Sequence, residues 1–275
     1  KKEKAKNILR KIPCIQKLYL KLKYFVFRIF LGKNSTAYKF LMKDQFRIRV
    51  SWGCMGTCSY CAIKNAIGEY KSKPLAECIK EFKRGLNDGC KYFIITADDT
   101  GPYGVDIGSS LPKLLREMIK FEGDYEILVR GISPGWFVKY INEFEEILEC
   151  GKIGGFGVPI QSGSSNILKL MRRYNDAEKM RDAFLRVNKM YPDVSFYIDV
   201  IVGFPTETWE DFMKTLHMIK DIDVNVGSLY AFSCRSGTEA ESIEPKIAED
   251  EIDRRLKYAK KFLKKMGYKV IYRRN

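Results

Sequence analysis

The chain has 275 residues, of which 45% are hydrophobic and 30% are charged, a globular composition that excludes a disordered or fibrous protein. Its 8 cysteines are too few for a disulfide scaffold of this length, so we expect a reducing, cytoplasmic setting. Charged residues interrupt every long apolar run, so we predict no transmembrane segment. The sequence does not indicate an oligomeric state.

Residues 1–45 are predicted to form a basic amphipathic helical extension. The formal net charge of the chain is +15, and residues 1–46 hold 13 Lys and Arg against only Glu3 and Asp44. Within this segment, residues 15–31 combine cations with aromatic and aliphatic side chains. Three roles stay open for it: a nucleic-acid-binding arm, an interfacial helix on acidic lipids, or a helix that covers an open side of the main domain.

From residue 46 onward, strand-like and helix-like segments alternate. The strand-like runs are 46–52, 91–97, 125–130, 155–160, 195–204 and 226–233. The helix-like stretches are 74–88, 110–121, 136–149, 165–190, 207–221 and 248–266. Consecutive β-α units predict a parallel sheet with right-handed crossovers. We therefore predict an α/β fold for residues 46–275, a partial (β/α)6 TIM-like barrel that is open on one side.

Polar and glycine-rich loops follow the predicted strands. They are the cysteine-containing segment after the first strand and residues 96–104, 161–165, 203–208 and 233–238. In barrels of this kind, the loops at the carboxyl ends of the strands converge and carry the chemistry. We therefore expect the functional site at this edge of the sheet.

Three cysteines, Cys54, Cys58 and Cys61, lie in the loop after the first predicted strand. Gly53 and Gly56 give this loop the freedom to curl. Thiolates at such short spacing can bind an iron–sulfur cluster, and three of them leave one iron open for a substrate or cofactor. Structural zinc, which takes four ligands, and plain core cysteines remain alternatives, although the only histidine lies far along the chain.

The segment CMGTCSYC, residues 54–61, resembles the C-x-x-x-C-x-Φ-C signature of the radical S-adenosylmethionine superfamily, with Tyr60 in the aromatic position. The resemblance implies that Cys54, Cys58 and Cys61 bind a 4Fe-4S cluster whose open iron is chelated by S-adenosylmethionine. It also implies an electron donor such as a flavodoxin or ferredoxin. The cofactor would be cleaved to methionine and a 5′-deoxyadenosyl radical, which abstracts hydrogen from the substrate.

Further blocks narrow the resemblance. Residues 158–176, 197–216 and 230–240 are similar, in order and spacing, to blocks of the methylthiotransferases, which insert sulfur and a methyl group into a C–H bond. Residues 95–115 look most like the archaeal and eukaryotic branch that acts on threonylcarbamoyladenosine in tRNA. The likeness covers about residues 47–265 and implies a methylthiotransferase-like transferase that modifies tRNA.

The resemblance also implies which residues contact S-adenosylmethionine. They are Tyr60, Asp98, Asp99, Arg130, Gln161, Ser162, Asp199 and Gly203. The two aspartates after the second strand would bind the amino group, since a carboxylate complements an ammonium, and the arginine would bind the cofactor carboxylate. Gln161 and Ser162 would bond the ribose or methionine part, whereas Tyr60 and the end of the fifth strand would approach adenine. Plain turns and surface positions are the alternative.

Two parts that methylthiotransferases usually carry have no counterpart in the sequence. One is an N-terminal domain with three cysteines for a second cluster, since only Cys14 precedes the signature; the other is a C-terminal RNA-binding domain of the TRAM type. This leaves the sulfur source and the substrate open. Two alternative functions therefore remain: a divergent radical enzyme that modifies a peptide or protein, and a non-catalytic module that binds a cluster or zinc.

Overall fold

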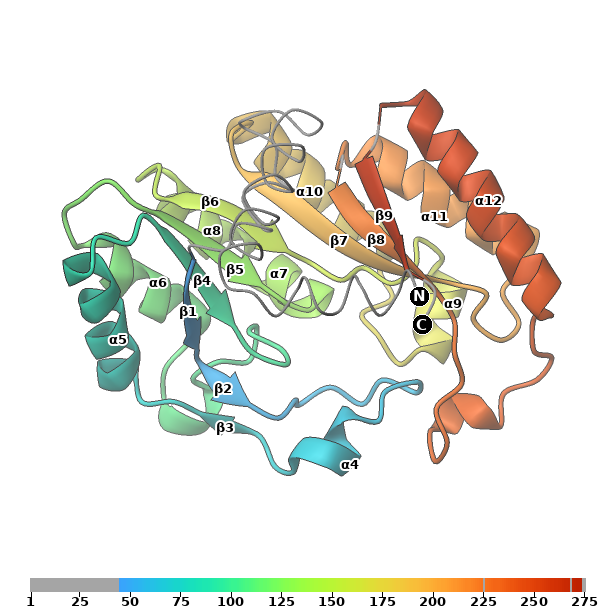
Figure 1. The fold of residues 1–275 in the computed structure, drawn as a ribbon, viewed down its shortest axis with the longest axis horizontal. Coiled ribbons are helices and arrows are strands. Elements are labelled where there is room, and N and C mark those ends of the chain that lie inside the picture. The colour runs from blue at the N-terminus through green and yellow to red at the C-terminus, as the bar shows by residue number, and fades with distance from the viewer. Residues whose placement is uncertain (1–44, 225, 268, 274–275) are drawn as a thin grey trace, which may run out of the picture. The chain divides into compact units, whose positions relative to one another are not determined.

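The fold is known from a computed structural model that describes residues 45–224, 226–267 and 269–273 (Figure 1). All but the last residue of the predicted extension over residues 1–45 lies outside these ranges, so the extension stays a prediction. Within the described ranges, no helix combines the length and the apolar character that a membrane span requires.

The centre of the fold is a sheet of seven parallel strands. In spatial order they are β1 (Phe46–Arg49), β4 (Tyr92–Thr96), β5 (Glu126–Arg130), β6 (Ile153–Gly157), β7 (Ser195–Val202), β8 (Val226–Ala231) and β9 (Lys269–Arg273). Spatial order follows chain order, so each crossover leads to the neighbouring strand, as in a β/α barrel. The predicted partial barrel is confirmed, with one strand, β9, added beyond the last predicted helix.

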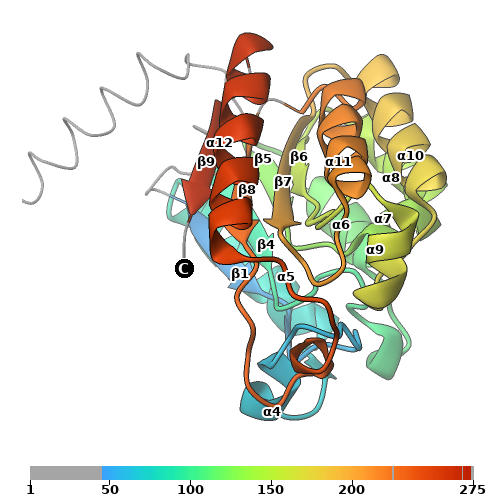
Figure 2. The ribbon, with the colours of Figure 1, turned by 90° about the vertical axis from the view of Figure 1, so that its right-hand side faces the viewer.

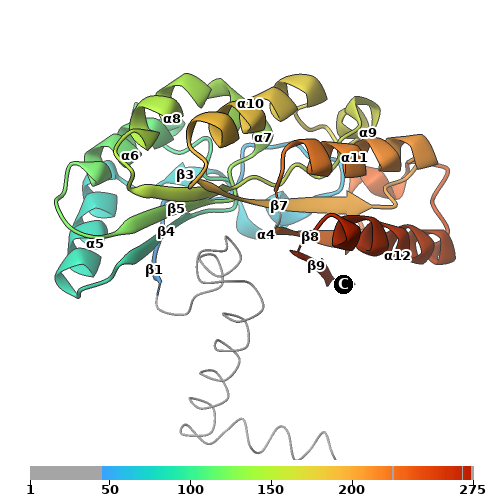
Figure 3. The same cartoon turned by 90° about the horizontal axis from the view of Figure 1, so that it is seen from above.

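Helices connect the strands and lie along one face of the sheet (Figure 3). They are α5 (Leu75–Asn87), α6 (Leu111–Ile119), α7 (Pro134–Lys139), α8 (Ile141–Leu148), α9 (Ser165–Leu170), α10 (Ala177–Met190), α11 (Trp209–Asp221) and α12 (Glu249–Lys265). Helix α12 lies beside β8 and β9 (Figure 2). Thr208 and Asp211 form a capping box that starts α11 by satisfying its first free amides.

Two predicted helices are each divided in the structure. The stretch 136–149 breaks at Tyr140, whose ψ of 10° ends α7 and begins α8. The stretch 165–190 breaks after α9, because Arg172 takes a left-handed φ of 51°, a conformation that ends helices. This second break matters for function, because it directs residues 172–174 to the carboxyl ends of the strands.

Two predicted strands also differ from the structure. The run 46–52 is divided, because Ser51–Trp52 leaves the main sheet as β2 and pairs antiparallel with β3 (Lys71–Ser72). The run 155–160 begins earlier, since the glycine-rich residues of β6 pair with β5 across an irregular register. The loops contain the short helices α4 (Ile63–Ile67), η1 (Val105–Ile107) and η2 (Glu239–Glu241).

The main hydrophobic core lies between the sheet and the helices. In β7, buried residues alternate with half-buried ones. Phe196 packs against Phe137 of α7 and Phe184 of α10, with ring centroids 5.7 and 4.6 Å away. Asp199 belongs to the opposite, half-buried set of the strand. Burial of the apolar set fixes the sheet against its helices, and the other set is left for the site.

Candidate functional site

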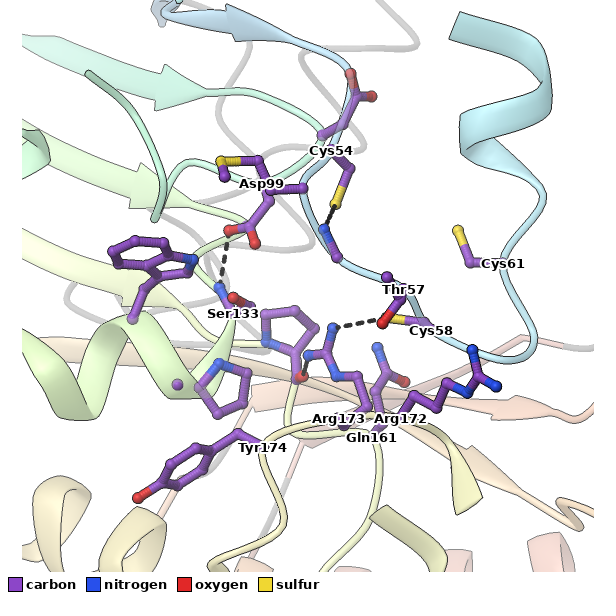
Figure 4. A pocket seen from close by; sticks show the side chains of 18 of the residues that line it. Cys54, Thr57, Cys58, Cys61, Asp99, Ser133, Gln161, Arg172, Arg173 and Tyr174 are labelled. Carbon is purple, nitrogen blue, oxygen red and sulfur yellow. Dashed lines mark hydrogen bonds between the residues drawn. The ribbon is translucent and has the colours of Figure 1, made fainter. Parts of the chain in front are cut away.

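A cavity of about 540 Å³ lies at the carboxyl ends of the first four strands of the sheet. Its lining includes all three cysteines of the signature, Asp98 and Asp99 after β4, the start of α7 and residues 172–174 (Figure 4). The loops therefore converge at the edge where the sequence predicted a site. We call residues 53–57 the leading half of the cysteine loop and residues 58–61 its trailing half.

The leading half is held at its start. Gly53 takes a left-handed φ of 75°, and a Cβ there would lie 2.8 Å from the Glu69 carbonyl oxygen, so the turn requires glycine. The Gly53 amide donates to Asp98 Oδ2 at 3.1 Å, and Arg49 donates to the same oxygen at 2.7 Å. Asp98 thus orients the loop.

Gly56 keeps a space open between two of the cysteines. Its amide donates to Cys54 Sγ at 3.2 Å. A Cβ at this position would lie 3.2 Å from Cys54 Sγ and 3.7 Å from Cys58 Sγ. A side chain would therefore fill the space that a group bound by both sulfurs needs.

The trailing half is anchored from two sides through Ser59. Its amide donates to the Met171 carbonyl oxygen at 3.1 Å, and its hydroxyl donates to the Leu170 carbonyl oxygen at 2.7 Å. Both acceptors lie at the end of α9, where a helix leaves carbonyl groups without partners. The Ser59 carbonyl oxygen in turn accepts from the Ala240 amide at 2.8 Å. The loop is thereby joined to α9 and to η2.

Tyr60 adds an apolar anchor to the trailing half. Its ring packs edge to face on Phe204, with centroids 6.4 Å apart. Phe204 belongs to a small buried cluster with Ile167, Met171 and Ala240. Burial raises the pKa of the Tyr60 hydroxyl, so Tyr60 is a neutral side chain in the site.

Arg173 is a site residue that the sequence analysis missed. Its Nη1 donates to Cys58 Sγ at 3.6 Å and its Nη2 donates to the Pro159 carbonyl oxygen at 2.6 Å. It comes directly after Arg172, whose left-handed φ turns the chain. The only sequence signal for Arg173 was its position in the block 158–176. Two adjacent arginines after a helix do not by themselves indicate which side chain points into a site.

Burial raises the pKa of the Cys54 thiol and of the Asp99 carboxyl group, although hydrogen bonds lower both. For Asp99, the lowering bonds include the amides of Ser133 and Gly101, which donate to Oδ1 at 3.1 and 3.0 Å. Desolvation disfavours an anion, so a neighbouring cation restores the ionised form. A metal at Cys54 and an ammonium at Asp99 would each supply that charge.

A second cavity of about 270 Å³ adjoins the first and shares Tyr60 and Gln161 with it. Its lining also includes Asp199 and Tyr230. Gln161 has a left-handed φ of 66°, and its Oε1 is buried without a hydrogen-bond partner among the described residues. An unpaired buried acceptor is costly, so a ligand that donates to this oxygen gains free energy.

Three of the predicted contact residues lie outside both cavity linings. Arg130 ends β5 with an exposed side chain. Ser162 is buried, and its hydroxyl lies 3.2 Å from that of Thr215 in α11. Gly203 has a φ of 83°, and a Cβ there would lie 2.4 Å from Ile252 of α12. Contacts of these three residues with a cofactor stay predictions.

The donor set fits an iron–sulfur cluster better than a single ion. All three cysteines line one cavity, and Gly56 keeps room between Cys54 and Cys58. Cysteine thiolates at short spacing are the usual ligands of iron–sulfur clusters, whereas structural zinc takes four ligands.

The sequence profile of the Radical SAM superfamily matches residues 48–219 of this chain. The chain belongs to the radical SAM superfamily. The matched range includes the three cysteines, both aspartates after β4, Gln161 and Arg173, so the cavity lies within the part of the barrel that defines the superfamily.

Curated relatives of this radical SAM chain include methylthiotransferases. The threonylcarbamoyladenosine tRNA methylthiotransferase of Thermotoga maritima is 36% identical over 216 residues, which cover 76% of this chain and 48% of the relative. The tRNA-2-methylthio-N(6)-dimethylallyladenosine synthase of Fusobacterium nucleatum is 32% identical over 217 residues, with 76% and 48% covered. A ribosomal protein methylthiotransferase of Thermotoga petrophila is 31% identical over 211 residues, with 76% and 49% covered. The chain thus spans about half the length of these relatives.

Solved structures support the fold. The radical S-adenosylmethionine methyltransferase TsrM of Kitasatospora setae superposes with a TM-score of 0.57 at 18% identity, covering 67% of this chain and 36% of that one. Coproporphyrinogen III oxidase of Escherichia coli, also a radical SAM enzyme, gives a TM-score of 0.56 at 16% identity, covering 86% and 57%. The partial barrel is therefore shared with radical SAM enzymes of quite different sequence.

Proposed function

We propose that the chain holds a 4Fe-4S cluster through Cys54, Cys58 and Cys61 and cleaves S-adenosylmethionine reductively, in a methylthiotransferase-like reaction on an adenosine of tRNA. The observation that carries this proposal is that the three cysteines line one cavity, which shares Tyr60 and Gln161 with a second. When bound through Cys54, Cys58 and Cys61, the cluster would supply one electron for reductive cleavage of S-adenosylmethionine, and the cofactor would supply the group that abstracts hydrogen from the substrate.

The side chains of the two cavities have complementary parts in holding the cofactor. Asp99 binds the ammonium of the methionine part, because a buried carboxylate gains from a cation. Arg173 takes the carboxylate in place of Arg130, since Arg173 lines the cavity and Arg130 does not. Gln161 accepts from a ribose hydroxyl through its unpaired Oε1, and Asp199 lies in the second cavity, where the nucleoside end extends. Asp98 acts indirectly, by orienting the loop.

The tRNA substrate is proposed from the relatives, two of which carry tRNA in their names. A second candidate is a peptide or protein substrate, which is favoured by the likeness to a methylthiotransferase of a ribosomal protein. A cytoplasmic setting and an electron donor of the flavodoxin or ferredoxin type belong to the same proposal.

Anaerobic reconstitution with iron and sulfide tests the proposal directly. We expect about four irons and four sulfides per chain, and 5′-deoxyadenosine after addition of reductant and S-adenosylmethionine. Cys58→Ser should lose most of the iron. Cys150→Ser, which changes an exposed free cysteine after α8, is the matched control and should keep it.

Three outcomes separate the alternatives. A protein that binds zinc but no cluster contradicts the enzymatic proposal. If the protein binds a cluster but forms no 5′-deoxyadenosine, the non-catalytic binding module is the remaining alternative. If 5′-deoxyadenosine forms and purified tRNA gains no mass while a ribosomal protein does, the protein substrate replaces tRNA.

A further inference from the structure

Arg173 brings a cation next to a sulfur of the proposed ligand set (Figure 4). Its Nη1 donates to Cys58 Sγ at 3.6 Å, and its Nη2 donates to the Pro159 carbonyl oxygen at 2.6 Å. A guanidinium group is not deprotonated in proteins. The sulfur of Cys58 therefore faces a permanent positive charge.

The end of α9 fixes where Arg173 lies. The Arg173 amide donates to the Leu168 carbonyl oxygen at 2.9 Å. The Arg172 amide donates to the Lys169 carbonyl oxygen at 3.0 Å. Together with the left-handed φ of Arg172, these two bonds make a Schellman motif, which ends a helix in one defined geometry. The backbone of Arg173 is thus held in place independently of its side-chain contacts.

The same helix end also holds the sulfur. Ser59, which directly follows Cys58, bonds the carbonyl groups of Leu170 and Met171 at 2.7 and 3.1 Å. The guanidinium and the sulfur are therefore both anchored to α9, so the structure sets their separation before any group binds. A charge that is already in position costs no reorganisation when a neighbouring group changes its own charge.

The guanidinium can keep this contact while it binds a ligand. Asp99 lines the same cavity, but its Oδ1 accepts from the amides of Gly101 and Ser133. Arg173 Nε is buried and has no hydrogen-bond partner among the described residues. Nε is therefore left for an acceptor such as the carboxylate of the proposed cofactor, while Nη1 stays on the sulfur.

We propose that Arg173 is a positioning residue that acts through Cys58: it holds a positive charge where it makes the group bound by the three cysteines easier to reduce. This inference rests on the proposed function. Reduction moves one electron to that group from an external one-electron donor, which is oxidised. Arg173 keeps its proton, so no bond forms or breaks at this residue.

The physical reason is electrostatic. One-electron reduction makes the bound group more negative, and a fixed cation beside a ligand sulfur stabilises the more negative form. Net charge and hydrogen bonds to the sulfurs are among the factors that set the reduction potential of iron–sulfur clusters. The contact of Arg173 with Cys58 supplies both a charge and a hydrogen bond.

Arg172 provides an internal comparison. It also lines the cavity, and it pairs with Glu239 at 2.8 Å, but the two side chains are 55% and 45% exposed. Water and salt screen a charge at that exposure. Removal of the Arg172 charge should therefore change the potential much less than removal of the Arg173 charge.

A redox titration of the reconstituted protein, monitored by electron paramagnetic resonance without S-adenosylmethionine, tests the proposal. Small mediator dyes carry the electrons, so docking of a protein partner plays no part. We expect Arg173→Met to lower the equilibrium constant of one-electron reduction about ten-fold, which is about 59 mV in potential. This shift should persist at high salt, because buried charges are screened weakly. Arg173→Lys should recover part of it, since it restores the charge without the forked donor.

Arg172→Met is the matched control and should change the equilibrium constant by less than about two-fold. Iron and sulfide are counted in every variant, and the Arg173 variants should keep the iron content of wild type, because Arg173 is not a ligand. If Arg173→Met binds little iron, Arg173→Gln, which removes the charge but keeps a polar side chain, is titrated in its place. It should show the same lowering of the potential.

The outcomes are distinct. Equal potentials for wild type and the neutral variants overturn the proposal, as does a shift of the same size in Arg172→Met. A loss of iron that is equal in the Met, Gln and Lys variants also overturns it, because Arg173 would then have a purely structural role. If wild type binds no iron, the proposed function fails first, whereas a wild-type cluster with unchanged potential in the variants rejects this inference alone.

Discussion

The two halves of the cysteine loop are held in different ways. In the trailing half, Ser59 exchanges three hydrogen bonds with α9 and η2, and Tyr60 packs into a buried cluster. In the leading half, Gly53 is bonded to one carboxylate, and Met55 and Thr57 are exposed. The barrel therefore fixes the positions of Cys58 and Cys61, whereas Cys54 belongs to a segment at the surface. The trailing half sets the geometry of the site, and the leading half gives access to it.

The largest effect is expected from the support of the trailing half. Phe204, which packs on Tyr60, lies in the turn that Glu207 closes by accepting from the Gly203 amide at 2.9 Å. Arg255 of α12 donates to the same Glu207 oxygen at 2.8 Å, and the two side chains are only 6% and 1% exposed. Arg255→Met leaves a buried carboxylate without its cation, which should lower the free energy of unfolding by about 3 to 5 kcal/mol.

Urea unfolding of cluster-free protein at about pH 8 measures this loss. The double variant Arg255→Met/Glu207→Gln removes both charges. It should recover most of the lost free energy of unfolding, because no unpaired ion is left buried. A single variant as stable as wild type would show that the ion pair does not support the turn.

The same pair predicts a pH dependence. Burial raises the pKa of Glu207 from the ordinary value of 4.5 to about 7, against the lowering effects of Gly203 and Arg255. The folded state thus keeps a proton that the unfolded chain has released, so the contribution of this group to stability is full below about pH 4.5 and falls as the pH rises to about 7. The stability of wild type relative to Glu207→Gln should fall by about 1 to 3 kcal/mol over that range. A constant difference would contradict the assignment.

A smaller effect is expected from a direct anchor of the trailing half. Ser59→Ala removes the hydroxyl that bonds the Leu170 carbonyl group and leaves a buried acceptor unsatisfied, so it should cost about 1 to 2 kcal/mol in urea unfolding. Thr57→Ala, an exposed change in the leading half, is the matched control and should cost less than about 0.5 kcal/mol. Equal losses of unfolding free energy in the two variants would contradict the proposed difference in how the two halves of the loop are held.

The smallest effect on stability is expected for Gly56→Ala in the leading half. Its added methyl group meets only the sulfurs of Cys54 and Cys58, so the cluster-free protein should unfold within about 0.5 kcal/mol of wild type. Iron binding should nevertheless fall severalfold, because the methyl group occupies the space between the two ligands. Full iron content in a stable Gly56→Ala protein would contradict the prediction, because it would show that the leading half can move enough to make room for the cluster.

Much of the fold could be predicted from sequence because its signals are local. Apolar runs and punctuated helices indicated six of the strands, and the polar loops that follow these strands indicated the edge of the sheet where the cavity lies. The missed features have no clear local sequence signal. β9 is stabilised by its ladder with β8, and the break before α10 depends on the φ of a single residue, Arg172.

The sequence by itself determined the ligand set that we propose for a cluster, because the three cysteines lie together in one short segment. Only the tertiary structure decided which polar side chains surround it. Arg173 rather than Arg130 enters the cavity, and Ser162 turns to Thr215 while its neighbour Gln161 stays in the lining. The physical reason is that the direction of a side chain follows from backbone dihedrals and from contacts with distant segments, and neither is encoded by the identity of the residue alone.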